Sequence, residues 1–274
     1  MGNAARVRLS ATQKFIQRFP QCCFCAGKRP SATRDHMPPK ALFDNSHRPD
    51  ELVVPACIEC NSGTSTADLI VSIMSRWSAE NTVQELDDHH RLATRLRKQA
   101  PEIIAEWNEG GLMMRIKGRR HLRDKGVSVP DGASTIAIGA LTVRQLNLFA
   151  HKATLALYFE YLGEALLETG AYFATWRTKE DYAVPGLPSD LLRLLPQYAT
   201  LSQGRWNTRE TFEYRLALNR EDGLLGFFAR LRWGVFVSGF AVRNAAMLPP
   251  GNTEWLAGGD LLNLLTTPRF CDRH

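Results

Sequence analysis

The spacing of apolar residues predicts two helical packing faces in the first half of the chain. Between about residues 66 and 108, apolar side chains recur at helical spacing with polar positions between them. The two stripes consist of Leu69, Ile70, Ile73, Met74 and Trp77, followed by Leu92, Leu96, Ile103, Ile104 and Trp107. We expect both stripes to pack against other elements.

A longer helix is predicted from Thr142 to about Thr169. The sequence from Thr142 to Gln145 has the form of a capping box, and Gly170 is typical of a helix end. The apolar residues between these limits make it the expected central helix of the carboxy-terminal part. His151 and Lys152 within it are interpreted as packing or surface residues.

After Asn207 the apolar period changes to two, which indicates β-strands. One face is predicted to carry Phe212, Tyr214, Leu216 and Leu218. A turn is expected at residues 221–223, and a second face is predicted to carry Phe227, Ala229, Leu231, Trp233, Val235 and Val237. This pattern predicts an antiparallel hairpin or meander covered by helices.

Short elements are predicted near the amino terminus. Residues 31–34 read as a strand that delivers Asp35 and His36 at its end, and residues 52–54 read as a second strand. Residues 61–70 can then form a helix. Together the patterns predict an α+β protein with three parts: a small module at 1–75, a helical basic connector at 76–130, and a larger domain of helix plus antiparallel sheet at 131–274.

Four of the six cysteines form two closely spaced pairs that flank the first predicted strand and loop. Cys22 with Cys25, and Cys57 with Cys60, are each separated by two residues, so one tight turn can present both sulfurs of a pair to one ion. The glycine at 27 permits the left-handed backbone that closes such a turn. We therefore predict a structural Zn²⁺ site rather than disulfides. The remaining cysteines, Cys23 and Cys271, are interpreted as unliganded thiols.

The order of these motifs resembles the zinc-stapled branch of the HNH (ββα-metal) endonucleases. Two cysteine pairs flank the dipeptide Asp35-His36, and Asn61 directly follows the last cysteine. The resemblance covers roughly residues 20 to 70. It implies that Asp35 and Asn61 bind a catalytic Mg²⁺ or Mn²⁺ and that His36 is the general base. Carboxylate and amide oxygens suit hard cations, and a neutral imidazole can take a proton from water near neutral pH.

The chain departs from the family pattern at one position. The resemblance implies an Asn before Leu52 that steadies the loop by backbone hydrogen bonds, but Asp50 and Glu51 stand there. Two further alternatives stay open. Asn61 could cap a helix instead of binding metal, and Asp68 could either support the site or lie on a solvated helix face.

The charge of the chain suits a polyanionic partner. It carries 34 Lys and Arg against 28 Asp and Glu, a formal net charge of +6. Candidate phosphate contacts are Arg34 and Lys40 near the module, and Arg119 and Arg120 in the densest basic stretch. Solvated surface positions would look the same for each of them.

These observations predict a metal-dependent HNH endonuclease that hydrolyses DNA, with a protein partner or a second copy bound through residues 131–274 as a further expectation. The alternative is a zinc-stapled nucleic-acid-binding or assembly module without cleavage. The absence of a long apolar segment and of a leader pattern predicts a cytoplasmic protein with no membrane partner. Enzymes that this chain resembles serve bacterial defence and mobile-element movement. We find no phosphate loop and no dinucleotide motif.

Overall fold

The computed structural model describes residues 10–77, 83–109, 111–124, 126, 136, 138–182, 189–249 and 254–266. It combines helices with antiparallel strands, which confirms the predicted α+β class. The helices are α1 Ala11–Arg18, α2 Ile58–Gly63, α3 Ser65–Met74, α4 Val83–Gln99, α5 Pro101–Glu109, α6 Gly111–Asp124, α7 Ala140–Leu162, α8 Lys179–Tyr182, α9 Ser189–Leu194 and α10 Leu261–Thr266. The strands are β1 Thr33–His36, β2 Val53–Ala56, β3 Ala171–Thr178, β4 Gln197–Thr200, β5 Ser202–Gln203, β6 Trp206–Asn207, β7 Phe212–Asn219, β8 Leu224–Leu231, β9 Val235–Val242 and β10 Leu256–Ala257. Short 3₁₀ turns cover Lys40–Leu42, Asp44–Ser46 and Ala245–Met247.

A six-stranded antiparallel sheet forms the carboxy-terminal layer, with strand order β10-β3-β9-β8-β7-β4. Strands β7, β8 and β9 are consecutive neighbours, so the predicted meander is confirmed. The prediction was wrong at Trp233, which is 53% exposed in the turn between β8 and β9 rather than on the buried face. The left-handed backbone of Arg232 closes this turn. A two-residue period cannot continue through a turn, so the apolar run splits into two strands.

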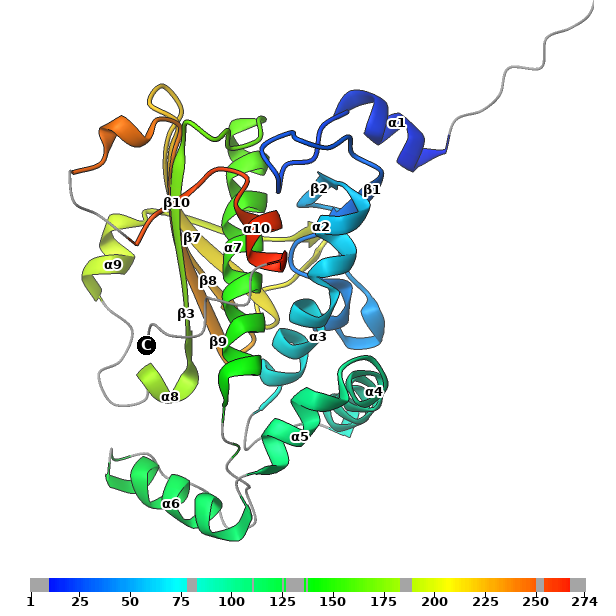
Figure 1. Cartoon of the computed structure of the whole chain (residues 1–274), viewed down its shortest axis with the longest axis vertical. Helices are drawn as coiled ribbons and strands as arrows, with labels where there is room; N and C mark the ends of the chain where they lie inside the picture. The colour runs from blue at the N-terminus through cyan, green and yellow to red at the C-terminus, as the bar shows by residue number, and fades with distance from the viewer. Residues whose placement is uncertain are drawn as a thin grey trace, which may run out of the picture.

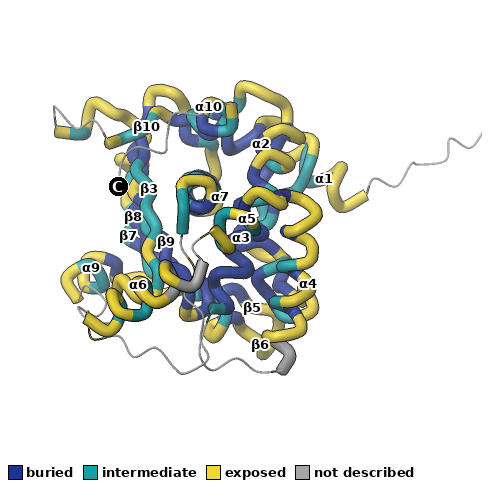
Figure 2. Tube along the Cα trace, turned by 60° about the horizontal axis from the view of Figure 1, so that its bottom comes forward, coloured by how far each residue is buried: buried dark blue, intermediate teal, exposed yellow. Residues whose placement is uncertain are grey.

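Helix α7 stands between the sheet and the amino-terminal elements (Figure 1). It contacts β3 and β9 on one side and α3 and β2 on the other. Because neighbours cover it on opposite sides, its apolar residues surround the helix instead of forming one stripe. Figure 2 shows buried positions along α7 and along the strands and helices that face it.

Both ends of α7 differ from the prediction. The helix ends at Leu162, seven residues before Thr169, because Gly163 takes the left-handed conformation (φ 76°) that closes a helix. At the other end, no capping box forms, since the N-cap is Gly139. The carboxylate of Glu106, from α5, accepts hydrogen bonds from the backbone N–H groups of Leu141 and Thr142 instead. A carboxylate that is distant in the sequence therefore accepts the free N–H groups at the start of α7, in place of the predicted local motif.

The amino-terminal segment forms a two-stranded sheet followed by two short helices. Strand β1 includes Asp35 and His36 themselves, and Asp35 pairs with Val54 of β2 in antiparallel register. The predicted helix at 61–70 begins earlier, at Ile58, and is divided at Thr64 into α2 and α3. Buried side chains of α3, including Leu69, Ile70 and Ile73, confirm the first predicted packing face.

One hydrophobic core joins the amino-terminal segment, helices α4 and α5, α7 and the sheet. Leu92, Leu96 and Ile103 are buried in it, which confirms the second packing face. All three predicted parts contribute to this core, so their division into separate domains stays a prediction. Among the described residues, the structure has no helix with the length and apolar character that a membrane crossing requires.

Candidate functional site

The four paired cysteines meet in one buried cluster. The sulfurs of Cys22, Cys25, Cys57 and Cys60 all lie within 4.8 Å of one another. All four residues are at most 2% exposed. Four thiolates at this mutual distance suit a tetrahedral Zn²⁺, so the cluster could hold a structural zinc, as the spacing predicted.

The backbone around the cluster explains how each pair converges. Gly27 has a φ of 73°, and its N–H donates to the carbonyl of Cys22 at 3.0 Å, which closes the first turn. Cys57 is the N-cap of α2, and its sulfur accepts the N–H of Cys60 at 3.4 Å. Cys23 is fully buried, and burial raises the pKa of its thiol well above the ordinary value. The predicted thiol Cys271 lies outside the described residues.

Asp35 faces away from solvent toward α7. Its side chain is 8% exposed, and one carboxylate oxygen, Oδ1, accepts the N–H of His36 at 2.7 Å. The other oxygen, Oδ2, lies 2.9 Å from the ammonium of Lys152. Both carboxylate oxygens are therefore held by specific neighbours.

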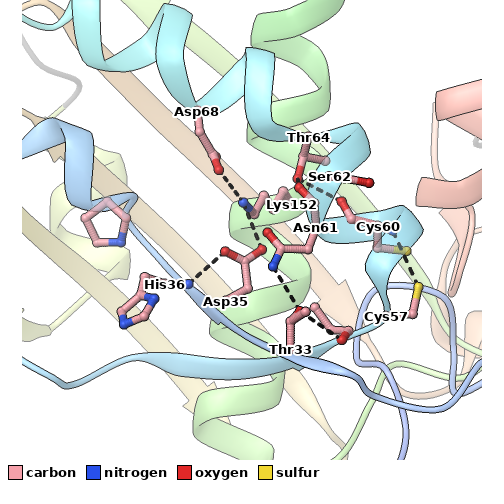
Figure 3. A network of polar contacts seen from close by, with 12 residues as sticks. Thr33, Asp35, His36, Cys57, Cys60, Asn61, Ser62, Thr64, Asp68 and Lys152 are labelled. Carbon is pink, nitrogen blue, oxygen red and sulfur yellow. Dashed lines mark hydrogen bonds and ion pairs between the residues drawn. The ribbon is translucent and has the colours of Figure 1, made fainter. Parts of the chain in front are cut away.

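Lys152 lies at the centre of an unpredicted cluster (Figure 3). Its side chain is fully buried, and Nζ also lies 2.7 Å from Oδ2 of Asp68. Burial alone would lower the pKa of Lys152, but the carboxylates of Asp35 and Asp68 outweigh that effect and raise it. The surface interpretation of Lys152 was wrong, because two carboxylates compensate the cost of burying its charge.

Asp68 reaches this cluster from α3 rather than lying on a solvated helix face. Its side chain is 16% exposed, and burial raises the pKa of its carboxyl to about 6 while the Lys152 ammonium opposes the rise. Oδ1 of Asp68 is buried without a hydrogen-bond partner among the described residues. One polar atom of the cluster is thus uncommitted.

Asn61 joins the same side of the small sheet. Its amide nitrogen donates to the hydroxyl of Thr33 at 2.9 Å, two residues before Asp35 on the same face of β1. Figure 3 shows the Asn61 side chain beside Asp35, with its oxygen turned from Thr33. The capping alternative is wrong, since Cys57 caps α2 and Asn61 is inside the helix. The amide oxygen is available to a hard cation.

His36 is the third of the predicted site residues. Its side chain is 19% exposed, and Nε2 lies 3.6 Å from a carboxylate oxygen of Asp50, which is longer than a hydrogen bond. Burial, together with the positive charges of Arg48 and Lys40, lowers the pKa of His36 to about 4. The imidazole is therefore neutral at neutral pH and can accept a proton.

Arg48 steadies the loop between β1 and β2, a role that the sequence did not reveal. Its guanidinium is buried and donates to five backbone carbonyls of that loop. The acceptors belong to Met37, Pro38, Pro49, Glu51 and Leu52. These are backbone hydrogen bonds of the kind that the resemblance attributes to the missing Asn.

The two acids at the expected Asn position have other partners. Asp50 accepts two hydrogen bonds from Arg34, at 3.0 and 2.9 Å. Glu51 accepts the backbone N–H of Ser202 at 2.8 Å, which ties the loop to the sheet side of the molecule. Neither acid replaces the Asn. In the sequence, only the position of Arg48 three residues before Glu51 could have indicated that it holds this loop.

The predicted phosphate contacts do not form one group. Lys40 is exposed near His36, whereas the guanidinium of Arg34 is already paired with Asp50. Arg119 and Arg120 lie on α6, which Figure 1 shows at the opposite end of the molecule from β1 and β2. Binding of nucleic acid by these residues stays a prediction.

Comparisons of the chain with protein-family models, with curated proteins and with solved structures find no match.

Proposed function

We propose that this protein is an HNH-type endonuclease that hydrolyses phosphodiester bonds of DNA at Asp35, His36 and Asn61. The observation that carries the proposal is the juxtaposition of these residues. Asp35 and the Thr33 partner of Asn61 lie on one face of β1, His36 follows directly, and the four-cysteine cluster holds the elements that present them.

The donor set fits a hard divalent cation. Asp35 supplies a carboxylate and Asn61 an amide oxygen fixed by its bond to Thr33, while Asp68 adds a buried negative charge beside them. With Asp35 and Asp68 ionised and Lys152 protonated, the cluster carries one net negative charge. Mg²⁺ or Mn²⁺ bound here would stabilise the negative charge that develops on the phosphate during hydrolysis.

His36 would take the proton from the attacking water. Its lowered pKa keeps the imidazole neutral, as a base must be, although a pKa of about 4 makes it a weak one. A phosphate beside the ring would favour the charged form and raise the pKa toward neutral pH. Arg48 would keep the ring in place by holding the loop that follows His36.

The test is cleavage of plasmid, linear duplex and single-stranded DNA by the wild-type chain and by His36→Ala. Each is incubated with Mg²⁺ or Mn²⁺, with EDTA as the metal-free control. We expect metal-dependent cutting that falls by at least about a hundredfold in His36→Ala, the usual scale of a lost general base. His90→Ala, at an exposed histidine of α4, is the matched control and should cut normally.

A second candidate function is a zinc-stapled nucleic-acid-binding module without cleavage. One observation favours it: Lys152 already neutralises Asp35, which lowers the attraction of that carboxylate for a metal ion. In the same experiment, this candidate predicts DNA binding by both chains and cutting by neither, with zinc content unchanged.

A further inference from the structure

Lys152 joins three elements that are far apart in the sequence. It extends from α7 to Asp35 on β1 and Asp68 on α3, at 2.9 and 2.7 Å. Its side chain is fully buried, so no solvent screens its charge. Lys152 and Asp68 alone would already form a neutral ion pair. The contact to Asp35 connects this pair to a residue of the proposed reaction.

We propose that Lys152 and Asp68 form a positioning pair for Asp35, with two effects. Lys152 anchors one oxygen of the Asp35 carboxylate, and Asp68 shares the lysine's charge, so that together they set how strongly Asp35 attracts a divalent cation. This inference rests on the proposed function.

The anchoring follows from the contacts of the Asp35 carboxylate. Oδ1 is held by the N–H of His36 and Oδ2 by the ammonium of Lys152, so rotation of the carboxylate breaks at least one contact. Each carboxylate oxygen has two lone pairs, so both contacts leave acceptor capacity for a cation. A carboxylate fixed in this way needs no reorganisation when the cation and the substrate bind.

The charge effect follows from counting the groups. Wild type has two carboxylates and one ammonium, a net charge of −1. Lys152→Met makes the cluster −2, Asp68→Asn makes it 0, and the double variant returns it to −1. Because these groups are buried, a change of one charge alters cation affinity on the order of tenfold or more.

The experiment measures Mn²⁺ binding to the full chain by electron paramagnetic resonance, in parallel with DNA cleavage. The variants are Lys152→Met, Asp68→Asn and the double variant, each checked for zinc content and for native circular dichroism. Glu213→Gln is the matched control, because it breaks another largely buried ion pair, with Arg230, in the sheet.

We expect Mn²⁺ affinity to rise about tenfold in Lys152→Met and to fall about tenfold in Asp68→Asn, with the double variant near wild type. Turnover at saturating metal should nevertheless fall in Lys152→Met, since Asp35 loses its anchor. Glu213→Gln should leave both quantities unchanged. Rescue of affinity by the double variant is a signature that a merely structural ion pair would not produce. If Lys152→Met does not fold, the proposal is still tested by the Mn²⁺ affinities of Asp68→Asn, expected to be below wild type, and of the double variant, expected to be near wild type.

Unchanged Mn²⁺ affinity in folded variants, with cleavage by wild type intact, would overturn this inference and leave the proposed function standing. Absence of both Mn²⁺ binding and cleavage in wild type and in all variants would overturn both. Mn²⁺ binding that is gained only in Lys152→Met would support the charge role of the pair and oppose the nuclease proposal.

Discussion

The protein contains two buried polar clusters that differ in how the chain builds them. The thiol cluster is made by Cys22, Cys25, Cys57 and Cys60, from two tight turns joined by one small sheet. The cluster around Lys152 joins residues from three elements, and its contacts span 84 positions from Lys152 to Asp68 and still more from Lys152 to Asp35. The first is a local construction, whereas the second exists only after α7 has packed on α3.

Because the two clusters are built differently, their contributions to the stability of the fold depend on different conditions. The four thiols could hold a zinc ion, and their contribution to folding would then depend on that metal. The Lys152 cluster is completed by its own opposite charges, so its contribution depends on keeping those charges balanced. Variants that disturb each cluster separately can test this contrast.

The largest effect is expected from breaking the thiol cluster with Cys57→Ser. Structural zinc binding is worth roughly 10 kcal/mol or more in small zinc domains, comparable with the whole stability of a typical protein. We therefore expect loss of zinc and loss of folded structure around β1, β2 and α2. Zinc content and circular dichroism measure this. Cys23→Ala, at a buried cysteine outside the cluster, should retain zinc and cost about 1 kcal/mol. Retention of a full native spectrum by zinc-free Cys57→Ser would contradict the prediction.

The next largest effect is expected from Lys152→Met. This change leaves two carboxylates in a buried site without their cation, which typically costs about 3–5 kcal/mol of unfolding free energy. Urea denaturation measures the loss, and Asp68→Asn in the same chain should restore part of it. The control is Lys28→Met, whose partner Glu168 is exposed, so that solvent screens the pair and its loss should be small beside that of Lys152→Met. Equal losses in the two lysine variants would contradict the comparison.

The sequence predicted the features that depend on local spacing. The cysteine pairs, the packing face of α3 and the alternation along β7 each follow from a period or a gap of a few residues. Such patterns specify which side of an element is buried, and the hydrophobic core then brings those sides together. The α+β class follows from the same reasoning.

The remaining features depend on contacts between distant residues. Nothing near Lys152 in the sequence indicates that Asp35 will lie within 2.9 Å of it. Arg48 was missed because its acceptors are backbone carbonyls, which every residue carries. The predicted capping box failed for a similar reason. Glu106 of α5 accepts the N–H of Thr142, which the side chain of Gln145 was expected to accept. Local motifs cannot exclude a better distant partner.

A smaller effect is expected from Arg48→Lys, which keeps the charge but cannot reach the same five carbonyls. Carbonyls left buried without donors cost about 1–3 kcal/mol, so we expect a loss of about 2 kcal/mol in urea denaturation. Hydrogen exchange of the loop between β1 and β2 should accelerate, while zinc content stays unchanged. Arg34→Lys, at a partly exposed arginine paired with Asp50, is the control and should cost less than about 1 kcal/mol. A loss confined to Arg34→Lys would show that Arg48 does not hold the loop.

The smallest effect is expected at His151, which is next to Lys152 in the sequence. Unlike the residues of the two clusters, this buried histidine has, in the part of the chain that the structure describes, no metal site or opposite charge to offset the cost of burying its charged form. Its Nδ1 is buried without a hydrogen-bond partner among the described residues, and burial lowers its pKa from 6.5 to about 4. Between these two values the unfolded chain binds a proton that the folded chain refuses, so stability falls as the pH drops from 6.5 toward 4 and is constant above that window. We expect His151→Phe, which keeps a ring against Tyr172 but cannot be protonated, to reduce the loss between pH 7 and pH 4.5 by about 2 kcal/mol. Urea denaturation at the two pH values measures it, with the exposed His90→Phe as the control. If both variants lost stability to acid as steeply as wild type, burial of His151 would not be the source of the acid sensitivity, and His36, whose pKa burial also lowers to about 4, would be the next histidine to test.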